Sequence, residues 1–361
     1  MKVKIGDLTK IKTGKLDANA SSEDGQYPFF TCSREPLKIS TYSYDCECVL
    51  VAGNGDLNVK YYNGKFDAYQ RTYIIEDNDS GKLFMPYLYY FMEGYIEELR
   101  KQAIGGVIKY IKLGNLTDAL IELPSVDEQK AIVDILEKSK KVLDMRHEEI
   151  SKLDDLIKAR FVELFGDPRS NPFGFEKKML KDTCKVITGN TPSRAIAEYY
   201  GDYIEWIKTD NIVSGILNPT QATESLSEKG MNVGRTVEKD SILMACIAGS
   251  IASIGRVCIT DRIVAFNQQI NAVVPEQYNI LFLYVLLQMS KDYLVEDINM
   301  ALKGILSKSK LEEKEFIIPP MDLQEQFSDF VKQVNKSKVK VQKALDETQK
   351  LFDSLMQQYF G

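Results

Sequence analysis

The sequence predicts an α+β fold: two mixed α/β domains separated by two long antiparallel helices that form a coiled coil, with a pseudo-two-fold internal repeat. The chain aligns with itself at an offset of 195 residues, and each copy ends in a stretch with heptad spacing. The rest of each copy combines strand-like and helix-like segments. Self-similarity at a fixed offset indicates duplicated structural units, and 361 residues can bury two separate cores.

The repeat is clearest where LPSVDEQKAIVDIL (123–136) matches IPPMDLQEQFSDFV (318–331). From there the two copies continue without a gap to the Phe-Gly pairs at 165–166 and 360–361. Each copy is therefore a variable mixed domain followed by a helix of constant length.

Both long helices are predicted from their ends and their period. Ser125 and Glu128 form a capping-box pattern at the start of the first helix, and Gly166 ends it. Seam positions alternate spacings of four and three over 132–164 and, in the second copy, over 327–359. Each helix of roughly 38 residues would be about 57 Å long at ~1.5 Å per residue.

An ordinary pair of amphipathic core helices would explain either stretch on its own. Because both copies have one length and end in Phe-Gly, we favour spacer helices. The chain leaves the first helix at Gly166, forms a domain and enters the second near Pro320, so a short connection favours an antiparallel pair. This pairing would place the two mixed domains at opposite ends of the helices, related by a pseudo-two-fold axis.

The repeat and the helix ends define four segments. Gly and Pro residues in GDPRSNPFGF mark the boundary after the first helix. The predicted segments are a first mixed domain at 1–122, a long helix at 123–166, a second mixed domain at 167–317 and a second long helix at 318–361.

The mixed domains contain strands near their start and a helix near their end. KTG (12–14) and ITG (187–189) align at an offset of 175 instead of 195, so the domains differ by insertions. Apolar runs that lead into glycine turns are typical of buried strands. The predicted strands are YPFF (27–30), DCECVLVAG (45–53), YIEWI (203–207) and DSILMACIAGS (240–250), and the predicted helices cover 85–102 and 278–297.

Catalytic motifs are missing from the sequence. The single histidine, His147, lies among charges on the first long helix, so histidine-based catalysis lacks its usual group. No G-x-x-x-x-G-K-[ST] phosphate loop is present. NPFG (171–174) resembles the tetrapeptide with which amino-methyltransferases hold a base, but it lacks the second proline, and we interpret it as a linker turn. We therefore expect a non-catalytic protein.

Cysteine usage and hydropathy predict a cytoplasmic protein that binds no metal. The six cysteines include no C-x-x-C pair and are interpreted as reduced thiols that mostly fill core space. No apolar run approaches the ~18–20 residues that span a bilayer. The opening MKVKIGDLTK continues into polar sequence instead of an apolar signal segment.

The net charge of −6 argues against a strongly basic nucleic-acid binder. The acidity is local, however: 119–167 carries 8 basic and 12 acidic side chains, whereas 1–118 carries 15 and 16 and 168–318 carries 17 and 18. Each mixed domain is therefore nearly neutral and can hold a basic face. Further phosphate contacts would have to come from partners.

The motifs and their order resemble those of type I restriction-modification specificity subunits. The resemblance rests on P-x-x-x-x-Q at 124–129 and 319–324, the long helix after it, FGDP at 165–168 and the duplicated variable domains. It covers essentially the whole chain.

The resemblance implies a non-catalytic DNA-binding protein with two target-recognition domains, each of which reads one half of an asymmetric bipartite site. The paired helices would fix the gap between half-sites, which can lie about one helical turn, ~34 Å, apart. The implied partners are double-stranded DNA, two copies of an adenine-N6 methyltransferase subunit, and restriction subunits. S-adenosylmethionine would be bound by the methyltransferase, and no cofactor is expected in this chain.

Candidate DNA contacts are polar side chains near predicted turns, because Arg, Asn and Gln can pair with base edges and Lys with phosphates. In the first domain these are Ser33, Arg34, Asn54, Lys60, Tyr61, Gln70 and Arg71. In the second they are Arg194, Lys208, Thr209, Asn211, Arg235, Ser250, Asn267, Gln268 and Gln269. Lys109, Lys303 and Lys308, in glycine-containing segments, are expected to contact phosphates.

The long helices are expected to contact the methyltransferase through faces outside the seam, with Asp154, Asp155 and Glu163 as an electrostatic element. Two other functions compete with DNA reading. A coiled-coil scaffold that binds only proteins would explain the helices but gives two divergent mixed domains no role. A cryptic nuclease or methyltransferase would need a catalytic site that the sequence does not contain.

Overall fold

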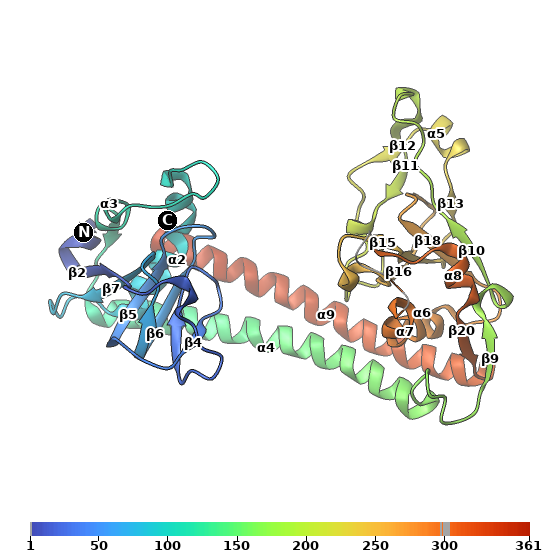
Figure 1. The fold of residues 1–361 in the computed structure, drawn as a ribbon, viewed down its shortest axis with the longest axis horizontal. Helices are drawn as coiled ribbons and strands as arrows, with labels where there is room; N and C mark the ends of the chain where they lie inside the picture. The colour runs from blue at the N-terminus through green and yellow to red at the C-terminus, as the bar shows by residue number, and fades with distance from the viewer. Residues whose placement is uncertain (1, 297, 299–303) are drawn as a thin grey trace. The chain divides into compact units, whose positions relative to one another are not determined.

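The computed structural model describes residues 2–296, 298 and 304–361, and it is a mixed α/β structure with two long helices (Figure 1). The chain forms two compact units. Unit 1 comprises 1–147 and 343–361, and unit 2 comprises 148–342. No helix in the described part of the chain is long and apolar enough to cross a membrane.

Unit 1 is built on a six-stranded sheet in which only β3 and β6 are parallel neighbours. The alternation of side chains along β5 explains its position in the sheet. Cys48 and Leu50 enter the core on one face, and Val49 and Val51 enter the core on the other. The strand order is β2 (Thr9–Thr13), β7 (Thr72–Asp77), β5 (Tyr44–Ala52), β6 (Val59–Ala68), β3 (Tyr27–Phe30) and β4 (Leu37–Ile39).

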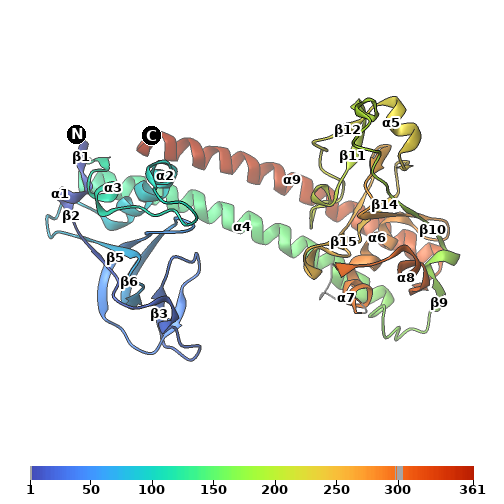
Figure 2. The same ribbon diagram turned by 45° about the horizontal axis from the view of Figure 1, so that its top comes forward.

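One face of this sheet is covered by α2 (Met85–Gln102), which has the predicted bounds. The other side of α2 packs against the end of α9 (Met321–Phe360), where the Tyr87 and Phe360 rings lie 5.1 Å apart (Figure 2). Smaller elements complete unit 1: β1 (Lys2–Lys4) paired with β8 (Leu120–Glu122), α1 (Ile5–Leu8), the 3-10 turn η1 (Ala18–Ala20) and α3 (Leu113–Thr117).

Unit 2 contains two four-stranded sheets and two strand pairs. One sheet has the order β10 (Cys184–Thr188), β18 (Ile270–Pro275), β14 (Ile242–Ala245) and β16 (Val257–Ile259). The other has the order β12 (Ser225–Leu226), β11 (Tyr200–Ile207), β17 (Val264–Phe266) and β13 (Thr236–Val237). The pairs are β15 (Ile247–Ala248) with β19 (Gly304–Ile305), and β9 (Glu176–Met179) with β20 (Glu315–Ile318).

Two predicted elements of unit 2 are divided. The helix predicted over 278–297 is two helices, because the backbone leaves the helical conformation at Ser290 (φ −97°, ψ 15°). The strand predicted over 240–250 is broken at Cys246, where the backbone bonds to Gln269 and Leu306 instead of continuing the ladder. The helices are α5 (Glu228–Val233), α6 (Ile280–Met289), α7 (Lys291–Val295) and α8 (Lys308–Glu313), and the 3-10 turns are η2 (Leu180–Asp182), η3 (Ala197–Tyr199), η4 (Thr209–Asn211) and η5 (Ile251–Ser253).

The long helix α4 spans Val126–Phe165, as its end signals predict. The Ser125 Oγ accepts a hydrogen bond from the Glu128 N–H at 3.3 Å, and the Ser125 N–H donates to the Glu128 carboxylate at 2.8 Å. Gly166 has φ +70°, a conformation that favours glycine. The predicted linker turn follows, with the Asn171 side chain bonded to the backbone of Phe175.

Each unit contains the start of one long helix and the end of the other. In unit 1, Leu136 of α4 shares a core with Leu355 and Phe360 of α9. In unit 2, Phe161 of α4 shares a core with Phe327 of α9. Within each unit the two helices therefore run in opposite directions, as the sequence predicts.

Candidate functional site

A buried glutamine joins α4 to α2 in unit 1. Gln129 has no exposed surface. Its side-chain oxygen accepts a hydrogen bond from the Phe84 N–H at 2.8 Å. Its amide group donates to the carbonyls of Lys82 and Pro124 at 2.8 and 3.0 Å. The glutamine of P-x-x-x-x-Q thus supplies hydrogen bonds to the segment that begins α2 and to the turn that begins α4.

Unit 2 contains the same arrangement 195 residues later. Gln324 is 1% exposed, accepts from the Asn279 N–H at 2.9 Å and donates to the Pro319 carbonyl at 2.8 Å. Asn279 is the N-cap of α6, the counterpart of α2. The repeat therefore preserves a buried polar contact between the long helix and the domain helix, and the two mixed domains are held on their helices in one way.

Two glycines hold corresponding loops against corresponding turns. A Cβ on Gly14 would lie 2.2 Å from the Ala68 carbonyl oxygen, and a Cβ on Gly189 would lie 2.2 Å from that of Asn267. Only glycine allows so close a backbone approach. In unit 1 the chain after β2 is thereby fixed against the turn that follows β6. In unit 2 the chain after β10 is fixed in the same way against the turn that follows β17.

These two turns have the same backbone bonds and different side chains. They carry Gln-Arg at 70–71 and Gln-Gln at 268–269. The carbonyl of the second residue accepts a hydrogen bond at 2.8 Å from Gly53 in unit 1 and from Cys246 in unit 2. The same backbone structure thus carries different polar side chains in the two units.

Arg34 and Asp56 form part of a charged group beside the unit 1 turn. The Arg34 Nε donates to the Asp56 carboxylate at 2.9 Å, and an Arg100 nitrogen lies 3.2 Å from the same carboxylate. The hydrogen bond from Arg34 lowers the pKa of Asp56. Arg100 also pairs with the Glu97 carboxylate, so two carboxylates balance the two guanidinium groups.

Lys60 adds a further cation to this region. Its Nζ donates to the Ser33 carbonyl at 2.7 Å and to the Asn58 side chain. Burial lowers the pKa of Lys60. The contact also explains where Ser33 lies, since Lys60 holds the loop after β3 against β6.

Asn54 and Lys109 meet through backbone contacts. Asn54 pairs with Tyr110 in an isolated antiparallel bridge. The Gly55 N–H donates to the Lys109 carbonyl at 3.0 Å. Residues predicted from separate segments therefore converge, and we call Ser33, Arg34, Asn54, Lys60, Arg71 and Lys109 the unit 1 cluster.

Arg71 is the most available group of the unit 1 cluster. Its side chain is exposed, and among the described residues no acceptor bonds to its guanidinium. The neighbouring Gln70 is exposed and donates to the Asp17 carboxylate at 2.8 Å. Tyr61 lies elsewhere: it alternates with Lys60 to the other face of β6, where its hydroxyl donates to Glu47 at 2.6 Å.

The corresponding charged group of unit 2 joins two cations to a single carboxylate. Glu224 accepts from Lys208 and pairs with Arg194 at 2.6 Å, and these hydrogen bonds lower its pKa. The Arg194 guanidinium also lies over the rings of Tyr200 and Trp206, at 4.4 and 5.2 Å from their centroids. Both predicted cations are therefore tied to one carboxylate and an aromatic pair.

Two of the predicted asparagines are buried. Asn211 is 7% exposed, with its amide bonded to Thr220, Gln221 and the Lys208 N–H. Asn267 is 5% exposed, and its oxygen accepts from the Gln269 N–H at 3.1 Å. These amides are bonded within their own loops and so help to position them, while contact with bases stays a prediction for both.

Arg235 and Gln268 are the accessible members of the unit 2 set. Both are exposed, and among the described residues no acceptor bonds to the Arg235 guanidinium. The Gln268 side chain accepts from the Thr191 hydroxyl, and the Arg235 N–H donates to the Asn190 side chain at 2.8 Å. The segment after β10 thus approaches both residues.

The remaining predicted contacts are dispersed in unit 2. Thr209 is half-buried, and its carbonyl accepts from Arg256 at 3.2 Å. Ser250 is exposed and hydrogen-bonds to Ser253 at 3.0 Å. Lys308, the first residue of α8, pairs with Glu312 at 3.5 Å, and Lys303 lies outside the described residues.

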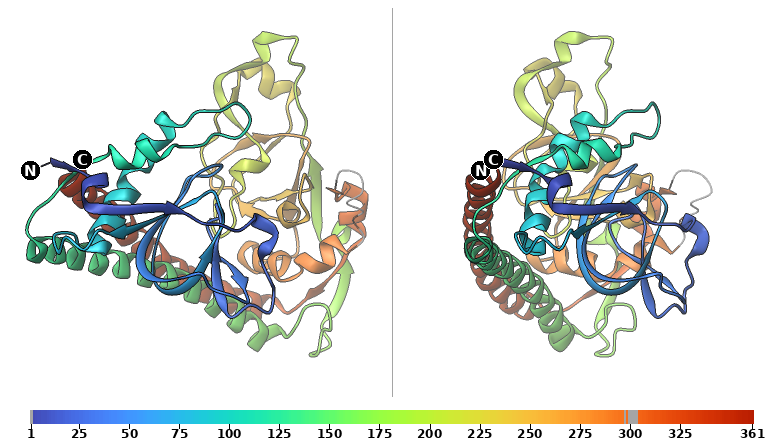
Figure 3. Two further views of the ribbon diagram at one scale, coloured as in Figure 1. Left: turned by 60° about the vertical axis from the view of Figure 1, so that its left-hand side comes forward. Right: turned by 90° about the vertical axis from the view of Figure 1, so that its left-hand side faces the viewer.

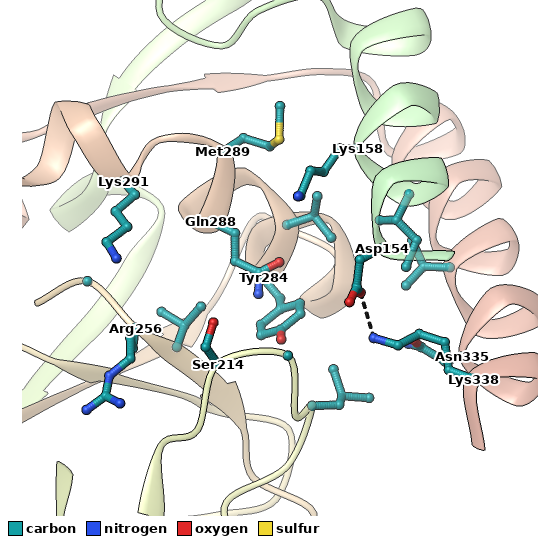
Figure 4. Close-up of a pocket in the computed structure, with 17 residues that line it drawn as sticks. Asp154, Lys158, Ser214, Arg256, Tyr284, Gln288, Met289, Lys291, Asn335 and Lys338 are labelled. Carbon is teal, nitrogen blue, oxygen red and sulfur yellow. Dashed lines mark hydrogen bonds and ion pairs between the residues drawn. The ribbon is translucent and has the colours of Figure 1, made fainter. Parts of the chain in front are cut away.

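The acidic residues predicted to face a partner are paired within the chain. The Asp154 carboxylate lies 2.6 Å from the Lys338 Nζ at the wall of a cavity of about 260 Å³ in unit 2 (Figure 4). Lys338 is a seam residue of α9, so Asp154 faces the other helix instead of pointing outward. Asp155 and Glu163 are exposed and pair within α4, with Lys158 at 3.1 Å and Arg160 at 2.8 Å.

The cysteines occupy the places predicted for them. Burial raises the pKa of Cys184, Cys246 and Cys258 to about 12. Within the described residues, no group of three or more His, Cys, Asp or Glu side chains is arranged to hold a metal ion. His147 is exposed on α4 and bonds to the Leu143 carbonyl at 2.9 Å.

Three residues of these charged groups were not predicted from the sequence. Arg100 belongs to a helical face with no motif, and Glu224 lies in a loop, so neither gives a local signal. Trp206 sits in the predicted strand YIEWI, where its burial is expected but its contact with two cations is not. Arg100 and Glu224 were hidden because their partners Asp56 and Arg194 are distant in sequence.

A family model described as the type I restriction modification DNA specificity domain matches residues 1–154 and 172–348. The specificity subunit of the type I restriction enzyme EcoDI from Escherichia coli is 44% identical over 135 residues, 37% of this chain and 30% of that protein. That of HindI from Haemophilus influenzae is 35% identical over 120 residues, 32% of this chain and 25% of that protein. The chain thus matches less than a third of the length of either relative.

Longer similarities are weaker. The specificity subunit of MjaIX from Methanocaldococcus jannaschii is 25% identical over 297 residues, 75% of this chain and 67% of that protein. A crystal structure of a type I restriction-modification S subunit from M. genitalium has a TM-score of 0.63 at 17% identity and covers all of this chain and 96% of its own. At this identity the structural likeness supports the fold alone.

Proposed function

This chain belongs to the type I restriction-modification DNA specificity family, and on that premise we propose that it reads DNA sequence for a methyltransferase complex and has no catalytic site of its own. The two turns after β6 and β17 carry the proposal. They have the same backbone contacts but present Gln-Arg in one unit and Gln-Gln in the other. A duplicated scaffold with different side chains is suited to reading two different half-sites.

The proposed target is bipartite and asymmetric, with one half-site for each recognition domain, 1–122 and 167–317. Support comes from the unit 1 cluster and from the exposed Arg235 and Gln268, since Arg pairs with guanine and Gln with adenine in the major groove. The unit 1 cluster is cationic and suits phosphates as well.

The long helices are proposed to form a coiled coil that fixes the gap between half-sites, with the two copies related by a pseudo-two-fold axis. Each helix has 40 residues without a break. At ~1.5 Å per residue it is about 60 Å long. The pair between Asp154 and Lys338 supports one register of the two helices.

Two copies of an adenine-N6 methyltransferase subunit are the proposed protein partners, joined by restriction subunits. A duplicated structure offers equivalent docking surfaces twice. S-adenosylmethionine would be held by the methyltransferase, and this chain would contribute position and sequence choice.

An exposed apolar stripe on α4 is the proposed methyltransferase contact in unit 1. Ile135, Val142 and Met145 are all exposed and lie at heptad spacing beside the seam. Replacing Val142 and Met145 by serine is expected to lower the amount of methyltransferase that copurifies at least tenfold, because apolar area at the interface is lost. Lys141→Ser is the control, and equal recovery with both variants would contradict this assignment.

Methylation of host DNA tests the proposed function directly. A host carrying this chain with a methyltransferase subunit is compared, by long-read sequencing, with a host that lacks only this chain. We expect a bipartite motif with N6-methyladenine in each half that disappears on deletion. If no methylated motif depends on the chain, a protein-binding scaffold becomes the better explanation.

Arg71 and Arg235, whose guanidinium groups bond to no acceptor among the described residues, should act on separate half-sites. Arg71→Gln is expected to weaken or relax one half of the methylated motif, and Arg235→Gln the other half, each by about 1–3 kcal/mol if the guanidinium contacts guanine. Motif-resolved methylation and binding to duplexes altered in one half measure the effect. Lys38→Gln, exposed on β4 outside the unit 1 cluster, is the control. Equal losses at both halves from either variant would show that these groups contact only phosphate.

A further inference from the structure

We propose that the hairpin over 104–110 inserts an aliphatic tip into a groove of double-stranded DNA beside the unit 1 cluster, an inference that rests on the proposed function. The hairpin follows α2 and is the teal loop that extends from unit 1 (Figure 3). Val107 is 104% exposed and Ile108 is 62% exposed. These side chains add nothing to the core of unit 1.

The hairpin has a defined conformation despite its exposure. Ile104 and Tyr110 exchange two backbone hydrogen bonds, of 3.0 and 2.8 Å. Gly105 has φ +118°, and a Cβ there would lie 2.5 Å from the Ile108 carbonyl oxygen. A Cβ on Gly106 would have no neighbour within 4 Å. The tip is therefore a formed turn that projects away from other atoms.

The base of the hairpin is bonded to the turn after β5, and that turn is bonded to the backbone of Arg71. The Gly55 N–H donates to the Lys109 carbonyl, and the Ile111 N–H donates to the Gly53 carbonyl at 2.9 Å. The Gly53 N–H in turn donates to the Arg71 carbonyl. The aliphatic tip is thus connected through Gly53 to Arg71, whose side chain is exposed, and the two can meet one ligand together.

The chemistry of this surface favours DNA over a protein partner. Lys109 follows Ile108 directly, and lysine is depleted in the apolar centre of protein interfaces. Aliphatic side chains flanked by cations are suited to DNA, where phosphates line each groove and apolar wedges such as Ile contact the bases between them. The small apolar area of two side chains also suits a base step better than a protein interface.

The test uses the complete chain in complex with its methyltransferase partner. We compare the wild type with a variant in which Val107 and Ile108 are both replaced by serine. Affinity is measured by fluorescence anisotropy for a duplex carrying the methylated motif and for an unrelated duplex of equal length. Val107→Ile combined with Ile108→Val is the matched control, because it keeps the tip aliphatic. Leu120→Ser, exposed on β8 of the same unit, controls for loss of surface apolar area.

The serine variant is expected to bind the motif duplex at least tenfold more weakly and the unrelated duplex within twofold of wild type. The aliphatic and Leu120 controls should match wild type, and copurification of the partner should not change. Loss of the partner from the serine variant would overturn the inference and assign the tip to a protein interface. An unchanged affinity for the motif duplex would overturn the inference alone. Failure of the wild-type complex to distinguish the two duplexes would overturn the proposed function as well.

Discussion

Replacing Gln129 by alanine is expected to lower the free energy of unfolding by about 2–4 kcal/mol, the largest stability effect that we predict for a single polar side chain. The change would leave the Phe84 N–H and the carbonyls of Lys82 and Pro124 without their partner. Each buried backbone group left unsatisfied costs about 1–3 kcal/mol, and solvent entry reduces the sum. Gln324→Ala should have a similar effect in unit 2.

Calorimetric unfolding of the purified chain measures both losses. Lys130→Ala and Glu325→Ala are the controls, because each is exposed and next to the glutamine on the same helix. Gln129→Glu should be as harmful as alanine at neutral pH, since a carboxylate cannot donate to the two carbonyls. The free energies of unfolding of Gln129→Ala and Lys130→Ala could differ by less than about 0.5 kcal/mol. In that case the hydrogen bonds of the glutamine do not explain why it is present in both copies.

Deleting seven residues from both long helices together is expected to shorten the gap in the methylated motif while leaving both half-sites unchanged. A deletion of 145–151 from α4 and of 341–347 from α9 removes one heptad from each, so the seam keeps its phase. Seven residues correspond to about 10.5 Å of helix at ~1.5 Å each. This is about three base pairs at the spacing of ~34 Å per turn.

Long-read methylome sequencing of hosts that carry the shortened chain gives the gap directly. Deletion of either segment alone is the control: it mismatches the two seams and should abolish methylation at every site. A doubly shortened chain that methylates the original motif with its original gap would exclude the helices as the element that sets spacing.

The long helices were predictable because their signals are local. The capping box at Ser125, the heptad seam and Gly166 lie within the segment that they define, and α4 has the predicted ends. The break at Ser290 was not predictable, since the apolar run continues through it and only tertiary packing divides α6 from α7.

The candidate site was predictable in composition and not in arrangement. Arg34, Asn54, Arg71 and Lys109 were chosen because they lie near turns, but only the pairing of the strands brings these turns together. Asn267 was chosen for the same reason, and its side chain bonds to its own loop. An asparagine in a loop can contact a ligand or bond to its own backbone, and the sequence does not distinguish the two.

Unit 1 is formed by two separate stretches of the chain, 1–147 and 343–361, and this affects how it folds during translation. Its core includes Leu355 and Phe360, so it can be completed only after the stretch that follows 148–342 has been translated. Almost two hundred residues intervene, which at ~5–20 residues per second is a delay of roughly 10–40 s. During that time the apolar surface of α2 that later receives α9 stays uncovered. We therefore expect unit 1 to complete its core later than its own N-terminal stretch is made, whereas unit 2 is formed by one continuous stretch, 148–342.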